Sequence, residues 1–319
     1  MSRTAKNAVI IMVATLLSRV LGFLRETILA NFYGTSMVAD VFVLTFNIPG
    51  LIISIIGSVI YMMYIPMYYD TRDRLGEDEA LKFTNNILNI LSVFSIIVSI
   101  LGIIFAGEII KIFAIGFTGE KFNLAVQFLR IMMFGVLFLS LNKIQSSFLQ
   151  VKESYLPASI VGVVYNIVII IAIFISVKLG SYYLAIGALV GLFIQVLLLL
   201  PCMYKRGYRY SFYMNIKDES IIKMIKLSIP MMMGVAMSQL NVYVDKALAS
   251  TLGDGKLAAL NYASRLNDFV VALFVTSLIT VIYPKLSQFV NNKDTINFKK
   301  IIVKSSNCII LVVVPIVLG

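Results

Sequence analysis

Long apolar runs recur along the entire chain, and each is long enough to cross a lipid bilayer as a helix. A spanning helix needs ~20 apolar residues in succession, whereas the strands of a membrane barrel alternate in polarity over roughly 10 residues. Hydrophobic residues make up 60% of the 319 residues, charged residues make up 13%, and the mean hydropathy is +0.93. The sequence therefore predicts an all-α, polytopic membrane helix bundle.

The apolar segments predict nine membrane-spanning helices. They cover residues 8–32, 38–68, 81–107, 122–150, 157–178, 182–203, 227–251, 257–290 and 301–319. The first six form a predicted N-terminal lobe at 1–203, and the last three begin a second, partial lobe at 227–319. Basic and aromatic residues in 204–226 predict a cytoplasmic amphipathic linker. The sequence ends inside an apolar run, so we expect the natural protein to continue beyond Gly319.

The formal net charge of +11 arises from basic residues that gather on one side of the predicted spans. If the N-terminus lies in the cytoplasm, the loops on the opposite side carry Lys111, Lys121, Lys178 and Lys256, and the other basic loop residues are cytoplasmic. An excess of basic residues in cytoplasmic loops is typical of membrane proteins. The pattern predicts a multi-pass protein with a cytoplasmic N-terminus, whose partner is the bilayer and not a nucleic acid.

Three charged residues, Arg19, Arg25 and Glu26, interrupt the first predicted span. A charge near the bilayer centre costs ~2.5–3.5 kcal/mol on insertion scales, so it is expected to face protein, water or a ligand. Arg265 also falls inside a later predicted span, 257–290. Guanidinium groups bind oxyanions through two parallel hydrogen bonds and stay charged when buried, which favours an anionic, phosphate-bearing substrate. In the alternative interpretation, the charges pair with one another and only fix the helix register.

The first and seventh spans are similar at an offset of 220 residues, which aligns Ser18 with Ser238. The offset brings the adjacent opposite charges at 25 and 26 onto Asp245 and Lys246, and a turn that contains glycine follows each span. Internal duplication is common in transporters, although chance similarity between two membrane helices would look the same. Asp245, with Asn241 nearby, offers oxygen ligands for a cation, so Na⁺ or proton coupling is possible there.

The sequence offers no recognisable catalytic site, so we expect a protein that is not an enzyme. It contains no histidine, no G-x-x-x-x-G-K-[ST] phosphate loop and no G-x-S-x-G nucleophile turn. Cys202 and Cys308 lie in or beside apolar segments and are expected to be packing residues. No cofactor is expected apart from a possible Na⁺ coupling ion. Transport would draw on an ion gradient or on the membrane potential.

Two stretches carry a resemblance to a known family. The run SRVLGFLRETILANFYGTSMVADVFVLTFNIPG at 18–50, together with NYASRLNDF at 261–269, resembles the MurJ (MviN) family of lipid II flippases. This family belongs to the multidrug/oligosaccharidyl-lipid/polysaccharide exporter superfamily. The resemblance implies two six-helix lobes in the bacterial cell membrane. It also implies alternating access that moves an undecaprenyl-pyrophosphate-linked peptidoglycan precursor from the inner to the outer leaflet.

The resemblance also implies roles for individual residues. By position, Arg25 and Arg265 resemble members of the family's pyrophosphate-binding arginine set. Arg19 and Glu26 resemble its neighbouring essential charges, and Asp40 resembles its gate aspartate. We therefore expect Arg19, Arg25, Glu26 and Arg265 to contact the substrate, and Asp40 to act as a gate.

A second group of positions bears on the ion and on the cargo. Asp245 resembles the ligand that the family's seventh helix gives to a sodium site. The sequence departs from the family at Ile53, where the family has a third arginine, and at Gly50, where it has asparagine. These departures leave open a flippase for another lipid-linked oligosaccharide. A cation-coupled multidrug exporter of the same superfamily and a non-transporting membrane scaffold are further alternatives, and the sequence does not predict an oligomeric state.

Overall fold

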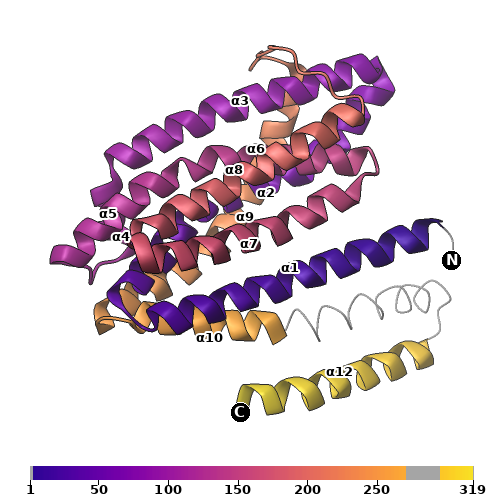
Figure 1. Cartoon of the computed structure of the whole chain (residues 1–319). Helices are drawn as coiled ribbons and strands as arrows, with labels where there is room; N and C mark the ends of the chain where they lie inside the picture. Colours follow the sequence, from indigo (N-terminus) through magenta and orange to yellow (C-terminus); the bar gives the residue numbers. More distant parts are fainter. Residues whose placement is uncertain (1–2, 271–294, 319) are drawn as a thin grey trace. The chain divides into compact units, whose positions relative to one another are not determined.

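The computed structural model describes residues 3–270 and 295–318 (Figure 1). The helices are α1 (Arg3–Tyr33), α2 (Met37–Leu75), α3 (Glu77–Ile104), α4 (Ala106–Phe113), α5 (Gly119–Met133), α6 (Gly135–Val151), α7 (Tyr155–Leu179), α8 (Tyr182–Lys205), α9 (Glu219–Ala249), the short 3₁₀ helix η1 (Ser250–Leu252), α10 (Lys256–Val270) and α12 (Thr295–Leu318). Within these residues no β-strand occurs, so the predicted all-α class is confirmed.

Six helical stretches have the length and the apolar composition to cross a membrane. They are Met37–Leu75, Glu77–Ile104, Gly119–Val151, Tyr155–Leu179, Tyr182–Lys205 and Glu219–Leu252. They coincide with the predicted spans from 38–68 to 227–251. The predicted span 8–32 is helical as part of α1, and α12 covers 301–318. The predicted span 257–290 is helical as far as Val270, and its remaining part lies outside the described residues.

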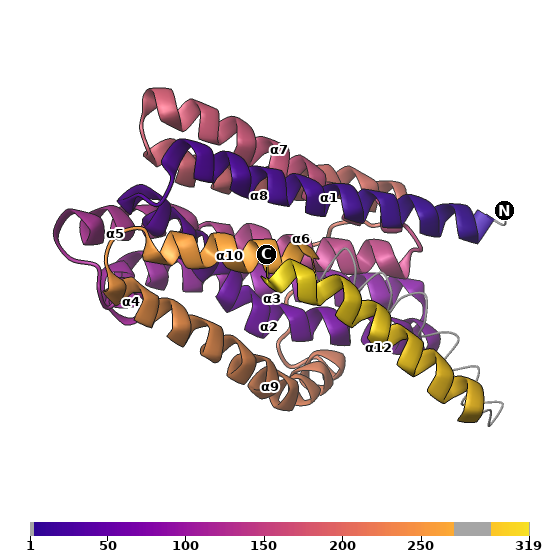
Figure 2. The ribbon, with the colours of Figure 1, turned by 90° about the horizontal axis from the view of Figure 1, so that it is seen from below.

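The chain divides into two compact units, Met1–Ala259 and Leu260–Gly319. Within the first unit, α2 packs against α3, α5, α6 and α9, while α7 packs against both α1 and α8. Figure 2 shows α1 running alongside α7. The predicted lobes at 1–203 and 227–319 stay a prediction. The first compact unit contains α9 in addition to the six predicted spans that precede it.

The last part of the predicted linker is helical. Residues 219–226 form the first turns of α9, and the assignment of 204–226 as a linker between lobes stays a prediction. Asp218 explains this start, because its side chain accepts hydrogen bonds from the backbone N–H groups of Ser220 and Ile221. An aspartate in this position satisfies backbone donors that a helix leaves open at its N-terminus. The segment was assigned from its basic and aromatic composition, so Asp218 was not recognised as a helix N-cap.

Aromatic side chains fill the core at the linker end of the first unit. Tyr64 stacks on Phe83 with ring centroids 6.0 Å apart, and Phe148 contacts Tyr68 and Tyr208 at 6.3 and 5.5 Å. These rings come from α2, α3, α6 and the linker. Because aromatic pairs add to the free energy of burial, they fasten the linker to α6 and join α6 and α3 to α2.

Asparagines on α3 hold the linker through hydrogen bonds to its backbone. Asn86 Nδ2 donates to the Asn215 carbonyl oxygen at 2.9 Å, and the Asn215 N–H donates back to Asn86 Oδ1 at 2.7 Å. Asn89 binds another linker carbonyl in the same way. Burial raises the pKa of the Tyr208 hydroxyl above its usual value, so it stays protonated and donates to Asn85 Oδ1 at 2.6 Å. We call Asn85, Asn86 and Asn89 the asparagine clamp.

Asn86→Leu is expected to release part of the linker from α3. Asn86 is fully buried, and the change removes both hydrogen bonds to Asn215. The loss of two hydrogen bonds with a net free energy of about 1 kcal/mol each should raise the open population roughly thirtyfold. Trypsin cleavage at Arg209 and Lys217 should accelerate accordingly. Ser92→Ala is the control, because Ser92 bonds only the backbone of its own helix. Equal cleavage rates in both variants would contradict the role of the clamp.

Candidate functional site

Arg25 and Glu26 form a buried ion pair on α1. The Nη2 atom of Arg25 lies 2.5 Å from Glu26 Oε1, and each residue is 8% exposed. Two adjacent residues of a helix point in different directions, so the long arginine side chain folds back over its neighbour. The pair satisfies both charges away from water, as buried charges require.

Arg25 also contacts an aromatic layer between α1, α2 and α7. Its guanidinium carbon lies 5.1 Å from the centre of the Phe46 ring, and Phe46 stacks on Tyr165 at 6.3 Å. A cation over an aromatic face is stabilised by the ring quadrupole, more strongly where water is excluded. The structure therefore places Arg25 facing protein. Its predicted contact with a substrate stays a prediction.

Arg19 has a different environment, one and a half turns before Arg25 on α1. It is exposed and lines a polar cavity of about 470 Å³ whose other walls come from α6, α7 and α8. Among the described residues no carboxylate lies within ion-pair distance of its guanidinium. A cation in this state is able to bind an anionic group that enters the cavity.

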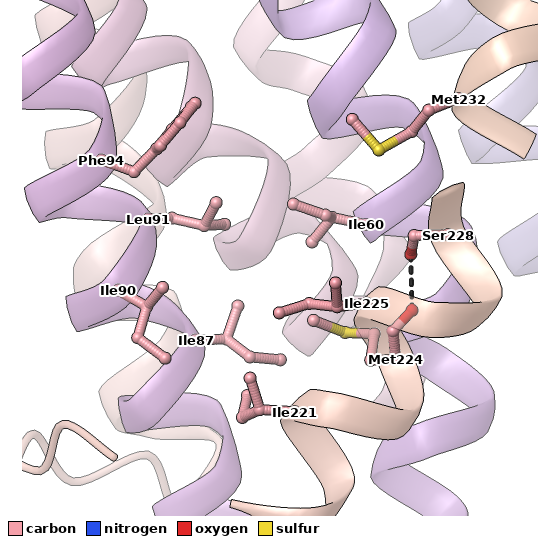
Figure 3. Close-up of a pocket in the computed structure, with 10 residues that line it drawn as sticks. All are labelled: Ile60, Ile87, Ile90, Leu91, Phe94, Ile221, Met224, Ile225, Ser228 and Met232. Atoms are coloured by element: carbon pink, nitrogen blue, oxygen red, sulfur yellow. Dashed lines mark hydrogen bonds between the residues drawn. The ribbon is translucent and has the colours of Figure 1, made fainter. Parts of the chain in front are cut away.

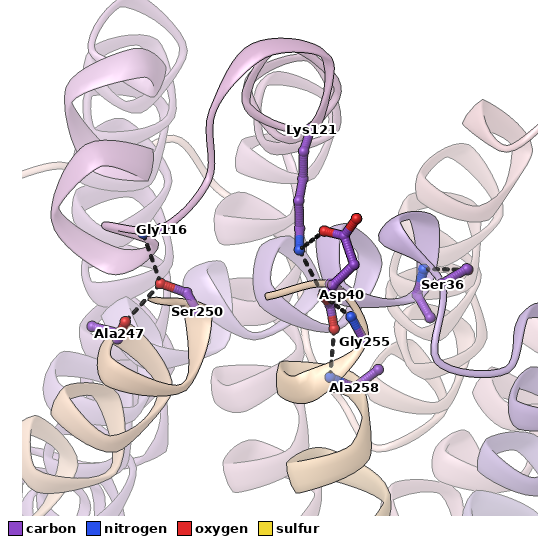
Figure 4. A network of polar contacts seen from close by, with 10 residues as sticks. Ser36, Asp40, Gly116, Lys121, Ala247, Ser250, Gly255 and Ala258 are labelled. Carbon is purple, nitrogen blue, oxygen red and sulfur yellow. Dashed lines mark hydrogen bonds and ion pairs between the residues drawn. The ribbon is translucent and has the colours of Figure 1, made fainter. Parts of the chain in front are cut away.

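Asp40 lies at the centre of a buried polar network at the end of the first unit away from the linker (Figure 4). It is fully buried in the first turn of α2. Its Oδ2 accepts a hydrogen bond from Lys121 Nζ at 2.7 Å, and Lys121 also binds Asp254 Oδ1 at 2.8 Å. Lys121 is 7% exposed, and Asp254 is open to solvent. One buried lysine thus joins a buried and an exposed carboxylate.

The same carboxylate also caps the N-terminus of α10. Asp40 Oδ2 accepts from the Gly255 N–H and Oδ1 accepts from the Ala258 N–H, both at 2.7 Å. The first N–H groups of a helix lack partners within the helix, and the helix dipole favours a negative charge there. Lys121 sits in the first turn of α5, where the dipole disfavours a cation, so its two carboxylates offset that cost. Asp40 therefore ties α2, α5 and α10 together.

Two glycines allow backbone segments to approach one another beside this network. Gly255 has φ +79°, and a Cβ there would lie 2.1 Å from the Thr35 carbonyl oxygen. A Cβ on Gly116 would lie 2.1 Å from the Ser250 carbonyl oxygen, and the Gly116 N–H donates to Ser250 Oγ at 3.1 Å. The segment between α9 and α10 thus packs directly on the α1–α2 and α4–α5 turns. We call the Asp40 network and these contacts the α10 junction.

The position that departs from the family, Ile53, lies next to a cation on another helix. Ile53 is 3% exposed and lines the same small cavity as Lys143 of α6. The ammonium of Lys143 lies 5.8 Å from the centre of the Tyr61 ring. In the described part of the chain, Lys143 forms no ion pair. A positive charge is therefore present beside Ile53, although no arginine stands there.

Two further predicted residues are not brought to these sites. Arg265 lies in the second unit, where its Nη1 is 3.9 Å from Asp268 Oδ2 and its side chain is 38% exposed. Asp245 is exposed on α9, and no group of three or more His, Cys, Asp or Glu side chains able to hold a metal occurs among the described residues. A shared site of Arg25 with Arg265 and a sodium site at Asp245 both stay predictions.

The sequence did not identify Lys121 or the amides of the polar cavity as functional candidates. Lys121 is 81 residues away from Asp40, and its position in an outer loop gave no sign of burial. Gln195 sits singly in an apolar run, Asn142 lies beside Lys143, and both line the cavity with Arg19. Amides in a predicted span were a usable signal, since a buried amide needs a hydrogen-bond partner.

Comparison with known proteins gives a consistent family assignment. A family model described as Lipid II flippase MurJ matches residues 29–319. A protein of Buchnera aphidicola subsp. Acyrthosiphon pisum named "Probable lipid II flippase MurJ" is 29% identical over 306 residues, which cover 93% of this chain and 59% of that protein. The chain spans about three-fifths of the length of the curated relatives it matches.

Solved structures share the arrangement of helices. A structure of lipid II flippase MurJ in an inward closed conformation is 28% identical, has a TM-score of 0.76, and matches 91% of this chain and 60% of that one. A structure of the MATE multidrug transporter DinF-BH has a TM-score of 0.67 at 16% identity, covering 97% of this chain and 70% of that one. At that identity the second likeness concerns the fold alone.

Proposed function

The chain belongs to the lipid II flippase MurJ family, and on that premise we propose that it moves lipid II, a lipid-linked pyrophosphate, from the inner to the outer leaflet. The movement occurs by alternating access in the bacterial cell membrane, with the N-terminus in the cytoplasm. Transport draws on the membrane potential or on an ion gradient, with Na⁺ as the candidate ion and Asp245 as a candidate ligand. The role is one of transport in peptidoglycan synthesis, without catalysis.

The observation that carries this proposal is the cation at the polar cavity. Arg19 lines a space between four helices of a membrane bundle, and no carboxylate of the described chain neutralises it. A charge in such a place is costly unless water or an anion meets it. Lys143, beside Ile53, supplies further positive charge in the same unit, whereas the charge of Arg25 is balanced by Glu26. Arg19 and Lys143 together suit a cargo that carries phosphates.

The α10 junction supports alternating access. In this proposal Asp40 is the gate residue, and the junction closes the outer end of the pathway while the linker end faces the cytoplasm. The junction holds with polar contacts between turns, and such contacts can exchange with water when helices separate. A transporter gate needs this kind of reversible closure.

The alternative of a multidrug exporter is less well supported. Cationic drugs need acidic or aromatic recognition, whereas the charged residue that lines the polar cavity is basic. A lipid-linked oligosaccharide other than lipid II would meet the same cations, and Ile53 in place of an arginine leaves that cargo as the second candidate.

Flipping of fluorescent lipid II in proteoliposomes tests the proposal. We expect the wild-type protein to expose the lipid in the outer leaflet under an imposed membrane potential or Na⁺ gradient. Arg19→Gln is expected to lower the rate by at least tenfold, because it removes the charge and keeps a polar side chain. Arg130→Gln is the matched control, since Arg130 lines a separate cavity between α4 and α5 that also contains Glu108 and Lys111. Absence of lipid II movement by the wild-type protein would refute the proposed function.

A further inference from the structure

An apolar cavity lies between α2, α3 and α9 near the linker end of the first unit (Figure 3). It has a volume of about 260 Å³. Aliphatic, methionine and phenylalanine side chains form its walls, and Figure 3 shows them around one common space. Its hydroxyl, from Ser228, donates to the Met224 carbonyl oxygen at 2.7 Å and so stays within its own helix. The cavity therefore suits an apolar ligand.

Water is a poor occupant for this cavity, and a hydrocarbon chain is a good one. A buried water makes about three hydrogen bonds to polar groups, so cavities with purely apolar walls stay dry. Phe94 of α3 is 37% exposed and Ile225 of α9 is 44% exposed, so the cavity is open at the surface of the first unit. Both helices have the length and composition of membrane spans, whose surroundings are hydrocarbon.

The length of the cavity fits a chain that enters from one leaflet. Its wall along α9 runs from Ile221 to Met232, which is about 16 Å at 1.5 Å per residue. One leaflet contributes about half of a hydrocarbon core that is ~30 Å thick. Because Ile221 lies in the first turn of α9, the cavity begins at the linker end. A lipid chain that starts there would reach the middle of the bilayer.

The segment that closes the linker end of the cavity carries a positive charge. Asn215 is bonded to Asn86 on α3, and the next residue of that helix, Ile87, lines the cavity. The chain then reaches the start of α9 at Glu219. Lys217 stands between these two points and is exposed. Within the part of the chain that the structure describes, its ammonium forms no ion pair, so it is able to meet an anionic group.

The remainder of the linker has the character of a segment in the lipid headgroup layer. Its backbone carbonyl groups at 209, 213 and 215 accept hydrogen bonds from the asparagine clamp. The alternate side chains, Tyr210, Phe212, Met214 and Ile216, are exposed. Residues 204–217 include no acidic residue, and their basic residues are Lys205, Arg206, Arg209 and Lys217. Aromatic and basic residues together favour the headgroup layer, where basic segments attract anionic lipids.

We propose that this cavity binds one acyl chain of an anionic phospholipid of the phosphatidylglycerol type, with the lipid phosphate held at Lys217. The apolar walls bury the methylene groups of the chain, which provides affinity. The positive charge of the linker provides the preference for an anionic head group. The bound lipid bridges α3 and α9 where their own side chains leave space. The site shares no lining residue with the Arg19 cavity and does not depend on the identity of the cargo.

The chain contains no tryptophan, so a single introduced tryptophan can report on this cavity. Phe94→Trp places the reporter in the cavity wall. Its fluorescence would be measured in phosphatidylcholine nanodiscs that contain a phospholipid brominated on its acyl chains, because bromine quenches only at close range. From the dependence on mole fraction, we expect phosphatidylglycerol to bind about fivefold more tightly than phosphatidylethanolamine, as one basic residue near the membrane surface provides.

The chain offers matched controls for the reporter and for the cation. Phe193→Trp places the tryptophan on an exposed phenylalanine of α8 that does not line the cavity, and it should show equal binding of the two lipids. Added to Phe94→Trp, Lys217→Gln is expected to remove the preference for phosphatidylglycerol. Lys205→Gln, at the end of α8, removes the same charge from another part of the linker and should keep the preference.

Three results would overturn this lipid site. Equal binding of the two phospholipids at position 94, or loss of the preference in both lysine variants, would show that no specific head-group contact exists. Quenching at 193 without quenching at 94 would show that protein covers the cavity. Displacement of the brominated phospholipid by an equal amount of undecaprenyl phosphate would assign the cavity to an isoprenoid chain instead.

Discussion

Arg25→Ala is expected to abolish lipid II flipping, and adding Glu26→Ala is expected not to restore it. The single variant removes a cation from the first unit and takes from the buried Glu26 its guanidinium partner at 2.5 Å. Breaking a buried ion pair by removing one partner costs ~3–5 kcal/mol, because the other charge keeps its desolvation penalty. The double variant removes both charges, so it relieves this structural cost and still lacks the cation.

The comparison separates a transport role from a structural one. Flipping would be measured in proteoliposomes, and stability would be measured by thermal melting in detergent at one scan rate. We expect Arg25→Ala to melt early and the double variant to melt near the wild-type protein, with both inactive. If flipping returned together with stability in the double variant, Arg25 would only fix the register of α1. The charge-pair interpretation would then be correct for this helix.

Asp40→Ala is expected to open the α10 junction, whereas Asp254→Ala should leave it nearly intact. Both carboxylates bind Lys121, at 2.7 and 2.8 Å, but Asp40 is fully buried and Asp254 is exposed. The buried partner also accepts two N–H groups from the start of α10. Its loss should cost ~3–5 kcal/mol, while exposed ion pairs contribute ~0–1 kcal/mol. The two variants thus differ mainly in whether the carboxylate that is removed is buried or exposed.

Hydrogen exchange gives a local measurement of this difference. The amides of Gly255 and Ala258 donate to Asp40, so peptides that contain them should exchange at least a hundredfold faster in Asp40→Ala, as a loss of ~3 kcal/mol implies. The same peptides in Asp254→Ala should exchange within about fivefold of the wild-type rate. Slow exchange at Ala258 in the Asp40 variant would show that the glycine contacts alone hold the junction.

The fold could be predicted to a large extent because membrane helices are specified locally. About 20 apolar residues in succession suffice to indicate a span, and the spans from 38–68 to 227–251 all appear as apolar helices. The start of α9 at Glu219, inside the predicted linker, was not anticipated, because composition was weighed above the capping residue Asp218. The predicted span 122–150 is formed by α5 and α6, with an interruption at Phe134 that the apolar run does not signal.

The candidate site could be predicted less completely, for a physical reason. The pair of Arg25 with Glu26 is local, so a sequence pattern found it. Lys121 meets Asp40 only through tertiary packing over 81 positions, and no local periodicity encodes that contact. The polar cavity likewise draws amide side chains from two helices, α6 and α8. Charged side chains were singled out in the predicted spans because a charge in lipid has a high free-energy cost. Uncharged amides have a smaller cost of burial and were therefore not considered as candidates.

The linker end of α9 is held separately from its far end, where the Tyr243 hydroxyl donates to the Asn47 carbonyl oxygen at 2.8 Å and Ser250 meets Gly116. At the linker end Lys223 Nζ lies 3.1 Å from Asp70 Oδ2, and the asparagine clamp holds the preceding chain. Its 31 residues give an arm of ~46 Å at 1.5 Å per residue. A tilt of only ~10° about the anchored end would carry the far tip through about 8 Å. Such a displacement exceeds the reach of any hydrogen bond, so a slight rotation near the linker is enough to part Ser250 from Gly116.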